Sequence, residues 1–233
     1  MSIFKKAEKS KSFLRLAISG PTGSGKTYSA LSIATGLSQS MDNTPIAFID
    51  TEHRSGSLYA DKFNFDVAEM NKPFSIPKYI RAIEDAQESG YKILIIDSLS
   101  HAWQELLEDH NKLTESSKYK GNSYRAWGET TPKQNSLVEA FLSFKGHLIC
   151  TVRSKMQYAL EQEPGKKATV VKVGMELEQR NGLEYEFTML LEGTVDNFFT
   201  VTKDRTGGFQ GKIINKPDEK MGKEIFVWLN SGK

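Results

Sequence analysis

The eight residues from 20 to 27 limit the folds open to this chain more than any other segment. They read Gly-Pro-Thr-Gly-Ser-Gly-Lys-Thr and match the pattern G-x-x-x-x-G-K-[ST]. Glycines at these spacings let the backbone bend tightly and turn its N–H groups toward phosphate oxygens. An apolar run over 14–19 precedes the segment, and apolar residues spaced for one helical face follow it over 26–39. We therefore expect a phosphate-binding loop between a strand and a helix, whose N-terminus adds its positive end.

The loop assigns roles to individual side chains. Lys26 should reach the β- and γ-phosphates of ATP, and the Thr27 hydroxyl should bind Mg²⁺. Asp97 ends a second apolar run over 92–97, and its carboxylate should hold the same Mg²⁺. A carboxylate at the end of a strand can instead cap the helix that follows, so this alternative stays open. The expected nucleotide-binding residues are Gly20, Pro21, Thr22, Gly23, Ser24, Gly25, Lys26, Thr27, Tyr28 and Asp97.

Hydrolysis of the nucleotide would need a water activator and added positive charge. Glu52, two residues past Asp50 at the end of another apolar run, is the candidate general base, and a solvated loop glutamate is the alternative. Arg153, Lys203 and Arg205 each follow a predicted strand and could stabilise transition-state charge. Ordinary surface cations are the alternative for all three. If a neighbouring subunit supplied them, hydrolysis would depend on assembly.

The alternation of strand-like and helix-like segments predicts an α/β fold with a mostly parallel sheet covered on both faces. A long loop is expected over 111–131, followed by a helix that Thr131 caps and that has Pro132 at its first position. We expect residues 13–233 to form one core and residues 1–12 to form an N-terminal arm. A further strand is expected over 147–152 and a hairpin over 156–173, and later strands over 185–191, 198–202 and 225–229 are expected to extend the sheet in antiparallel fashion.

Composition excludes several classes of protein. A net charge of +2 identifies no partner, and the single cysteine, Cys150, rules out an internal disulfide. The four histidines are scattered without metal-ligand spacing. No window approaches the roughly 18 apolar residues of a membrane span, and the basic N-terminus lacks the apolar core of a secretory signal. We therefore expect no membrane association and a cytoplasmic location.

Three segments together resemble the RecA recombinase core over roughly residues 13–206. Residues 46–53 (Ile-Ala-Phe-Ile-Asp-Thr-Glu-His) are similar to the RecA segment that ends in its catalytic glutamate. Residues 93–98 resemble its Walker B strand, and Val-Thr-Lys-Asp-Arg over 201–205 resembles the segment whose lysines reach a neighbour's ATP. Where that family has a glutamine that senses the γ-phosphate, this chain has Thr151, which becomes a further nucleotide-site residue with Arg153.

The whole set is most similar to small phage ATPases built from a RecA-type core, some of which are single-strand annealing proteins. Residues 152–155, 173–174, 181–187 and 203–206 carry this likeness. The resemblance implies ATP and Mg²⁺, binding of single-stranded DNA, a homo-oligomeric ring or filament with ATP at subunit interfaces, and action beside a single-strand-binding protein. Phe4-Lys5-Lys6-Ala7 fits a Phe-x-x-Ala pattern by which such proteins insert into a neighbour, although a frayed terminus is the alternative.

Two mobile loops bind DNA in RecA-type cores. The first would correspond to residues 113–130, in a region 111–133 with five Lys or Arg against two Glu. Cations hold phosphates while aromatic rings stack on bases, so this composition suits a single strand. The alternative for the first loop is that Tyr124 and Trp127 are core anchors of an ordered loop. The alternative for the second loop is that residues 164–167 form a solvated charged turn. The candidate nucleic-acid contacts are Lys118, Tyr119, Lys120, Tyr124 and Arg125 in the first loop and Lys155, Lys166 and Lys167 in the second.

Several functions fit these features. The first is an ATPase, stimulated by DNA, that promotes annealing or recombination. A second is a DNA-binding module in which ATP is bound but hydrolysed negligibly. A third is another motor, such as a helicase or packaging ATPase, and a fourth is a small-molecule kinase, which would show a lid and an acceptor pocket.

Overall fold

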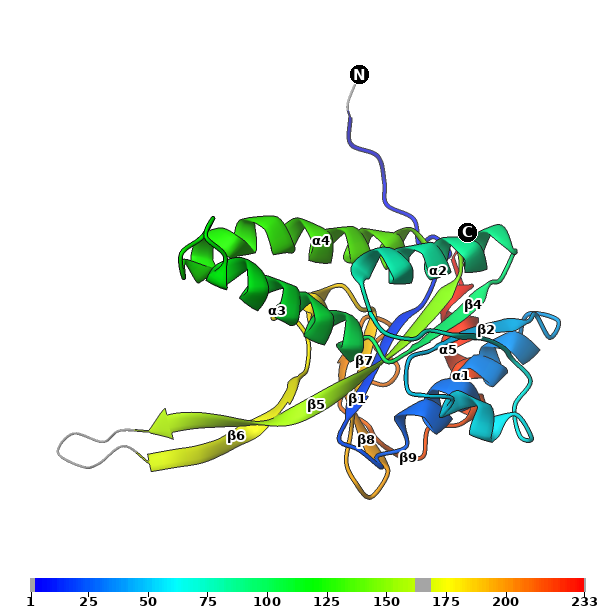
Figure 1. Ribbon diagram of the computed structural model, residues 1–233. Coiled ribbons are helices and arrows are strands. Elements are labelled where there is room, and N and C mark those ends of the chain that lie inside the picture. Colours follow the sequence, from blue (N-terminus) through cyan, green and yellow to red (C-terminus); the bar gives the residue numbers. More distant parts are fainter. Residues whose placement is uncertain (1–2, 162–168, 233) are drawn as a thin grey trace.

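A nine-stranded sheet forms the centre of the computed structural model, which describes residues 3–161 and 169–232, with the backbone alone over 156–175. The order across the sheet is β3-β2-β4-β5-β1-β7-β8-β9, with β6 paired to β5 (Figure 1). The strands are β1 (Arg15–Gly20), β2 (Ile46–Asp50), β3 (Asp66–Glu69), β4 (Ile93–Asp97), β5 (His147–Glu161), β6 (Thr169–Leu177), β7 (Met189–Gly193), β8 (Phe198–Asp204) and β9 (Ile213–Asn215).

The pairing confirms the predicted fold class. The six strands from β3 to β7 in this order are parallel, whereas β8, β9 and β6 are antiparallel to their neighbours. The helices are α1 (Lys26–Gln39), α2 (Ile76–Glu88), α3 (Ser100–Glu115), α4 (Ser123–Ser143) and α5 (Glu219–Leu229), with 3-10 turns η1 (Gly56–Tyr59) and η2 (Leu183–Tyr185). The chain is therefore a RecA-like α/β domain.

The central strands are buried along their whole length because helices cover both faces of the sheet. Alternate residues of each strand join different apolar clusters: Ile93 and Ile95 pack with α1 and α5, while Leu94 and Ile96 pack with α2, α3 and α4. Figure 1 shows these two groups of helices on opposite sides of the sheet. This arrangement leaves the carboxyl ends of the parallel strands as the edge at which polar groups can gather.

Two glycines allow α1 and α5 to pack closely. A Cβ added at Gly36 would lie 2.0 Å from the carbonyl oxygen of Glu219, and one at Gly222 would lie 2.2 Å from that of Ile33. Contacts this short are impossible for real side chains, so each helix presents bare backbone to the other. The loop-bearing helix α1 is thereby fixed against the C-terminal helix.

The predicted loop over 111–131 is wrong in most of its length. Helix α3 continues to Glu115, and α4 begins at Ser123, where the Asn122 side chain accepts a hydrogen bond from the Arg125 amide at 3.0 Å. Pro132 lies inside α4 rather than at its start. Proline removes only one backbone bond from a helix of 21 residues, which the flanking turns tolerate. The predicted helix start at Thr131 is therefore incorrect.

Two other segments differ from expectation. Residues 225–229, predicted as a strand, belong to α5, in which Met221, Ile225 and Leu229 are buried at four-residue spacing. Over 185–191, a 3-10 turn ends at Tyr185 and only the stretch from Met189 onward is a strand. A short apolar run fits either a strand or one face of a helix, which is why periodicity alone misassigned 225–229.

The N-terminal residues 3–14 form no helix or strand; Leu14 is buried in the core, whereas the start of this arm extends away from the sheet (Figure 1). The Lys9 ammonium lies 3.7 Å from the Trp228 ring centroid and donates to the Trp228 carbonyl, which ties the base of the arm to α5. Further out, the Phe4 side chain is 86% exposed. Among the helices in the described ranges, none is both long enough and apolar enough to cross a membrane.

Candidate functional site

Four neighbouring strands bring the predicted site residues to one edge of the sheet. The phosphate loop follows β1, Glu52 follows β2, Asp97 ends β4, and Thr151 and Arg153 lie in β5. Strand register places Asp50 beside Asp97 and Gly20 beside Arg153. The residues are spread over more than a hundred positions of the chain, yet the parallel sheet collects them, as expected for a ligand site at the carboxyl ends of strands.

The loop over 20–27 is shaped to receive an anion. Gly25 adopts a left-handed conformation at the N-cap of α1, and the first turn of α1 contains neither a side-chain cap nor an acidic residue. The Ser24 hydroxyl is buried and has no hydrogen-bond partner among the described residues. A Cβ at Gly20 would lie 2.5 Å from that hydroxyl oxygen, so only glycine fits there. The uncapped amides and the unpaired hydroxyl suit a triphosphate.

Lys26 folds back on the loop. Its ammonium donates to the carbonyls of Gly20 at 3.0 Å and Pro21 at 2.9 Å. Burial lowers the pKa of Lys26, an effect that the nearby carboxylates of Asp97 and Glu52 oppose. The side chain is thus held inside the loop, where the phosphates would lie.

Asp97 is buried and receives hydroxyl hydrogen bonds on both carboxylate oxygens. Thr27 Oγ1 donates to Oδ2 at 2.6 Å, and Thr151 Oγ1 donates to Oδ1. Burial raises the pKa of Asp97, which these two bonds oppose. Since the side chain faces Thr27 and Thr151, and no side chain caps α3, the capping alternative is not supported.

The oxygens of Thr27 and Asp97 are the hard ligands that Mg²⁺ prefers, and they lie beside the phosphate loop. The described part of the chain contains no group of three or more His, Cys, Asp or Glu side chains that could hold a metal ion. The pair therefore fits a metal that takes its remaining ligands from phosphate and water rather than a metal caged by the protein.

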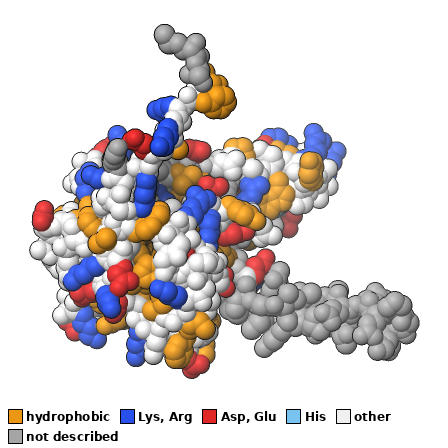
Figure 2. Space-filling model, turned by 180° about the vertical axis from the view of Figure 1, so that it is seen from behind, with side chains coloured by type: hydrophobic (Ala, Val, Ile, Leu, Met, Phe, Trp, Pro, Cys, Tyr) orange, Lys and Arg blue, Asp and Glu red, His pale blue; other side chains and the backbone are white. Residues whose placement is uncertain are grey.

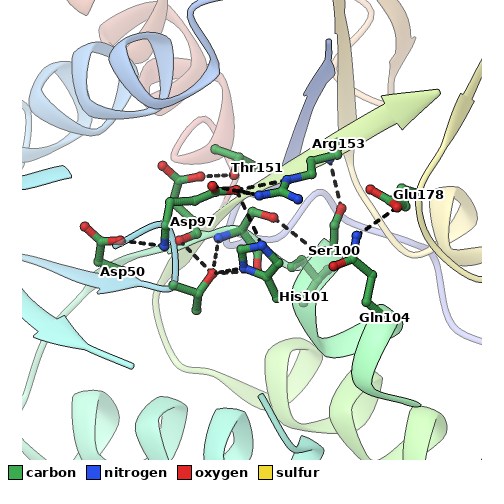
Figure 3. A network of polar contacts seen from close by, with 12 residues as sticks. Asp50, Asp97, Ser100, His101, Gln104, Thr151, Arg153 and Glu178 are labelled. Atoms are coloured by element: carbon green, nitrogen blue, oxygen red, sulfur yellow. Dashed lines mark hydrogen bonds and ion pairs between the residues drawn. The ribbon is translucent and has the colours of Figure 1, made fainter. Parts of the chain in front are cut away.

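Glu52 is not a freely solvated loop residue. The guanidinium of Arg153, which Figure 3 labels, donates to both of its carboxylate oxygens. Nη2 lies 2.8 Å from Oε1 and 2.8 Å from Oε2. Asp50 fixes the turn by accepting from the amides of Glu52 at 2.7 Å and Gly56 at 2.9 Å. Burial would lower the pKa of Arg153, but hydrogen bonds and charge from Glu52 raise it overall.

Lys203 and Arg205 contact backbone of their own chain. Lys203 Nζ donates to the carbonyls of Glu184 and Tyr185, both at 2.8 Å, and Arg205 Nη2 donates to that of Tyr185 at 2.9 Å. Burial, followed by the charge of Arg205, lowers the pKa of Lys203. Among the contacts of the described residues, the structure does not bring either cation to the phosphate loop.

Two residues beside the loop, Asn197 and Lys216, were not predicted from the sequence. With Tyr28, which was predicted, they line a pocket of about 280 Å³ next to Gly25. Asn197 Nδ2 donates to the Gly23 carbonyl at 3.1 Å, which ties the β7–β8 turn to the phosphate loop. The Asp-Asn pair at 196–197 signals a turn in the sequence, but nothing in it indicates which distant loop the turn contacts.

The predicted nucleic-acid residues divide into groups. Lys118 and Tyr119 both contact Glu129, and Lys155 pairs with Glu176 at 3.8 Å. Lys120, Tyr124 and Arg125 are exposed, and Figure 2 shows Lys and Arg side chains gathered at the end of the α3–α4 projection. Lys166 and Lys167 lie outside the described residues.

An open groove of about 850 Å³ lies between α3, α4 and the segment after β6. Its lining combines aromatic rings and cations: Trp103, Tyr124, Arg125, Trp127 and Arg180 are among the residues. Trp127 stacks on His110 with 3.9 Å between ring centroids, so it is held in place while one edge faces the groove. Arg180, which the sequence analysis did not single out, lies 5.7 Å from the Trp127 ring centroid.

Comparison with known proteins adds two findings. A family model described as an AAA domain matches residues 12–216. Among solved structures, a KaiC-like protein from the hyperthermophilic archaeon Pyrococcus horikoshii matches with a TM-score of 0.52 and 16% identity, covering 86% of this chain and 85% of that chain. At this identity the likeness shows the fold alone. No curated protein matches the chain.

Proposed function

Because this chain belongs to the AAA domain family and is a P-loop ATPase core, we propose that it hydrolyses ATP and does so in response to single-stranded DNA. The observation that carries the proposal is the convergence of the phosphate loop, Asp97 and Glu52 at one edge of the sheet. A bare phosphate-binding site would need only the loop, whereas this edge adds a metal-binding carboxylate and a candidate base.

Each residue has a task in this scheme. The loop amides and Lys26 bind the phosphates, and Thr27 and Asp97 would hold Mg²⁺, which neutralises charge on the phosphate oxygens when bound. Thr151, bonded to Asp97, orients that carboxylate rather than replacing the glutamine of RecA. Glu52, whose position Asp50 fixes, orients and deprotonates the attacking water.

The groove between α3 and α4 is the proposed site for the nucleic acid. Tyr124 is 88% exposed and offers a ring for stacking, while Arg125 and Arg180 supply positive charge. Stacking surfaces beside cations suit a single strand better than a duplex.

Annealing or recombination would follow from holding single strands in a homo-oligomer with ATP between subunits, beside a single-strand-binding protein. The exposed arm with Phe4 offers a means of subunit contact. This part draws on the resemblance to small phage ATPases.

The decisive experiment measures ATP turnover while a poly-dT oligonucleotide is titrated, at two salt concentrations. We expect turnover to rise with the oligonucleotide and the midpoint to move to higher concentration with salt, because phosphate contacts release counterions. Duplex DNA and single-stranded RNA of equal length are the matched comparisons.

A second candidate is a DNA-binding module that binds ATP with negligible turnover. The observation in its favour is that both oxygens of Glu52 are occupied by Arg153. Tight ATP binding without turnover at saturating oligonucleotide would establish this candidate and reject the first.

A further inference from the structure

The pairing of Glu52 with Arg153 has a consequence for control of the site. A general base must have an oxygen free to accept a proton from water. Here three hydrogen bonds of 2.8–3.1 Å from the guanidinium cover the carboxylate. Charge-assisted bidentate pairs are among the stronger polar contacts in proteins. In this arrangement Arg153 engages both oxygens and sets the orientation of the carboxylate, so a water must compete with the guanidinium for it.

Arg153 stands where β5 leaves the main sheet and enters the hairpin with β6. Its amide donates to Ser100 Oγ at 2.9 Å at the start of α3, and its carbonyl accepts from the Glu178 amide at 2.7 Å just after β6. The next residue, Ser154, pairs with Leu177 in the hairpin. The backbone of Arg153 is therefore bonded both to α3 and to the segment that follows the hairpin.

The same segment continues into the proposed nucleic-acid groove. Gln104 of α3 donates to Glu178 at 2.8 Å, and Gln179 donates to the Leu99 carbonyl at 2.7 Å (Figure 3 shows the first of these bonds). Arg180 and Asn181, the two residues that follow, line the groove. A continuous path of bonded residues thus joins the groove wall to the guanidinium that covers Glu52.

We propose that Arg153 is a positioning residue that restrains Glu52, and that occupation of the α3–α4 groove shifts the segment 178–181 and releases the carboxylate. The inference rests on the proposed function in taking Glu52 as the base and the α3–α4 groove as the nucleic-acid site. It assigns Arg153 an inhibitory role in the absence of nucleic acid, opposite to that of a charge-stabilising finger.

The test compares ATP turnover of wild type, Arg153→Gln and Arg153→Lys without nucleic acid. Glutamine removes the charge and the fork, so kcat should rise about tenfold, equivalent to about 1.4 kcal/mol, with KM for ATP unchanged. Lysine keeps one charge without the fork, so its kcat should lie between the two. The oligonucleotide should then stimulate Arg153→Gln less than wild type.

Three variants serve as controls. The double variant Arg153→Gln/Glu52→Gln should lose the gain, since the released group is absent. Arg81→Gln breaks an exposed pair with Asp85 on α2 and should leave turnover unchanged. Gln104→Ala cuts the link between α3 and Glu178 without touching Arg153, and should raise basal turnover by a smaller factor. If circular dichroism shows that Arg153→Gln does not fold, the basal turnover of Arg153→Lys and Gln104→Ala tests the restraint instead.

A basal kcat that is unchanged or lower in the folded Arg153 variants would overturn the proposal that Arg153 restrains Glu52. A rise in kcat that persists in the double variant would overturn it as well. Failure of the proposed function is seen separately, as a wild type that does not hydrolyse ATP even with the oligonucleotide. In that event turnover by Arg153→Gln still supports the restraint, and its absence still rejects it.

Discussion

Lys26 shows at the residue scale how a side chain can be both structural and poised for a ligand. Its two bonds to loop carbonyls keep the ammonium among the amides that would meet the phosphates. We predict that Lys26→Ala leaves the free energy of unfolding within about 1 kcal/mol, because these are single neutral-acceptor bonds of a half-buried group. ATP turnover should fall at least ~100-fold, since the charge on the phosphates is then uncompensated.

The measurement pairs chemical denaturation with steady-state turnover. Lys216→Ala is a matched control, because it removes an exposed lysine from the pocket beside the loop rather than from the loop itself. Unchanged hydrolysis by Lys26→Ala would remove the loop from the active site.

His147 makes the stability of the protein depend on pH. Its Nδ1 accepts from the Leu14 amide at 3.1 Å, so the ring is neutral, and burial together with Arg15 lowers its pKa from the ordinary 6.5 to about 4. The unfolded chain binds this proton between pH 6.5 and 4 while the folded chain does not. Stability from this group is therefore present above pH 6.5 and is lost as pH falls toward 4, by about 3 kcal/mol.

The prediction is checked by urea denaturation across that pH range in wild type and His147→Asn. Asparagine keeps an acceptor near the Nδ1 position but does not titrate, so its stability curve should be flatter over this window. Parallel curves for the two proteins would assign the pH dependence to other groups.

The sequence located residues that belong to a local pattern, but it gave no sign of contacts between residues far apart in the chain. The loop over 20–27, Asp97 and Glu52 each follow an apolar run, and the structure brings them together. The bond between Glu52 and Arg153 spans 101 positions. Its existence depends on the strand order, in which β5 lies beside β4 and β1, and no local pattern carries that order.

Helices α1 and α5 can approach closely only through glycine. We predict that Gly222→Ala lowers the free energy of unfolding by about 2–3 kcal/mol, because its Cβ would overlap the Ile33 carbonyl oxygen and push the helices apart. Gly128→Ala is the matched control in α4, where a Cβ would meet nothing within 4 Å. There the better helix propensity of alanine should raise stability by up to ~1 kcal/mol. Thermal unfolding of the two variants should therefore shift in opposite directions.

The start of α4 was the main error in predicting the helices and strands, because the helix begins at Ser123 rather than at Thr131. Thr131-Pro132 has the residues of a helix start, and the stretch before it shows little apolar periodicity because only Ala126 and Thr130 of its first eight residues are buried. Helix α4 forms there because it packs on α3 through the Trp127–His110 stack. Tertiary contact, rather than propensity, extends the helix.

The same extension places Tyr124 on a rigid element beside the groove. We predict that Tyr124→Ala weakens binding of a short poly-dT oligonucleotide by about 1–3 kcal/mol, the usual contribution of one stacked base. Tyr124→Phe keeps the ring and should bind within about twofold of wild type. Fluorescence anisotropy at fixed salt measures both. Equal affinity of Tyr124→Ala and wild type would show that this ring is not a stacking surface.

At the scale of the whole molecule, the β5–β6 hairpin and the α3–α4 projection extend from the same side of the sheet (Figure 1). The nucleotide site lies at their base, where Arg153 joins the sheet to the hairpin. By contrast, among the contacts of the described residues, Lys203 and Arg205 donate to carbonyls within η2 and not to their own phosphate loop. If they stabilise transition-state charge, a neighbouring subunit must receive them.

Mixing two inactive variants tests this arrangement. Lys26→Ala inactivates its own phosphate site but keeps Lys203, whereas Lys203→Ala keeps an intact phosphate site but lacks the donated charge. In a homo-oligomer, a Lys203→Ala site beside a Lys26→Ala neighbour regains the missing cation, so the mixture should turn over ATP several times faster than the average of its parents. Lys26→Ala mixed with Glu52→Gln is the control, because both lesions lie in one subunit's own site and no intact site can form. A Lys203→Ala mixture that only averages its parents would place the action of Lys203 within its own subunit.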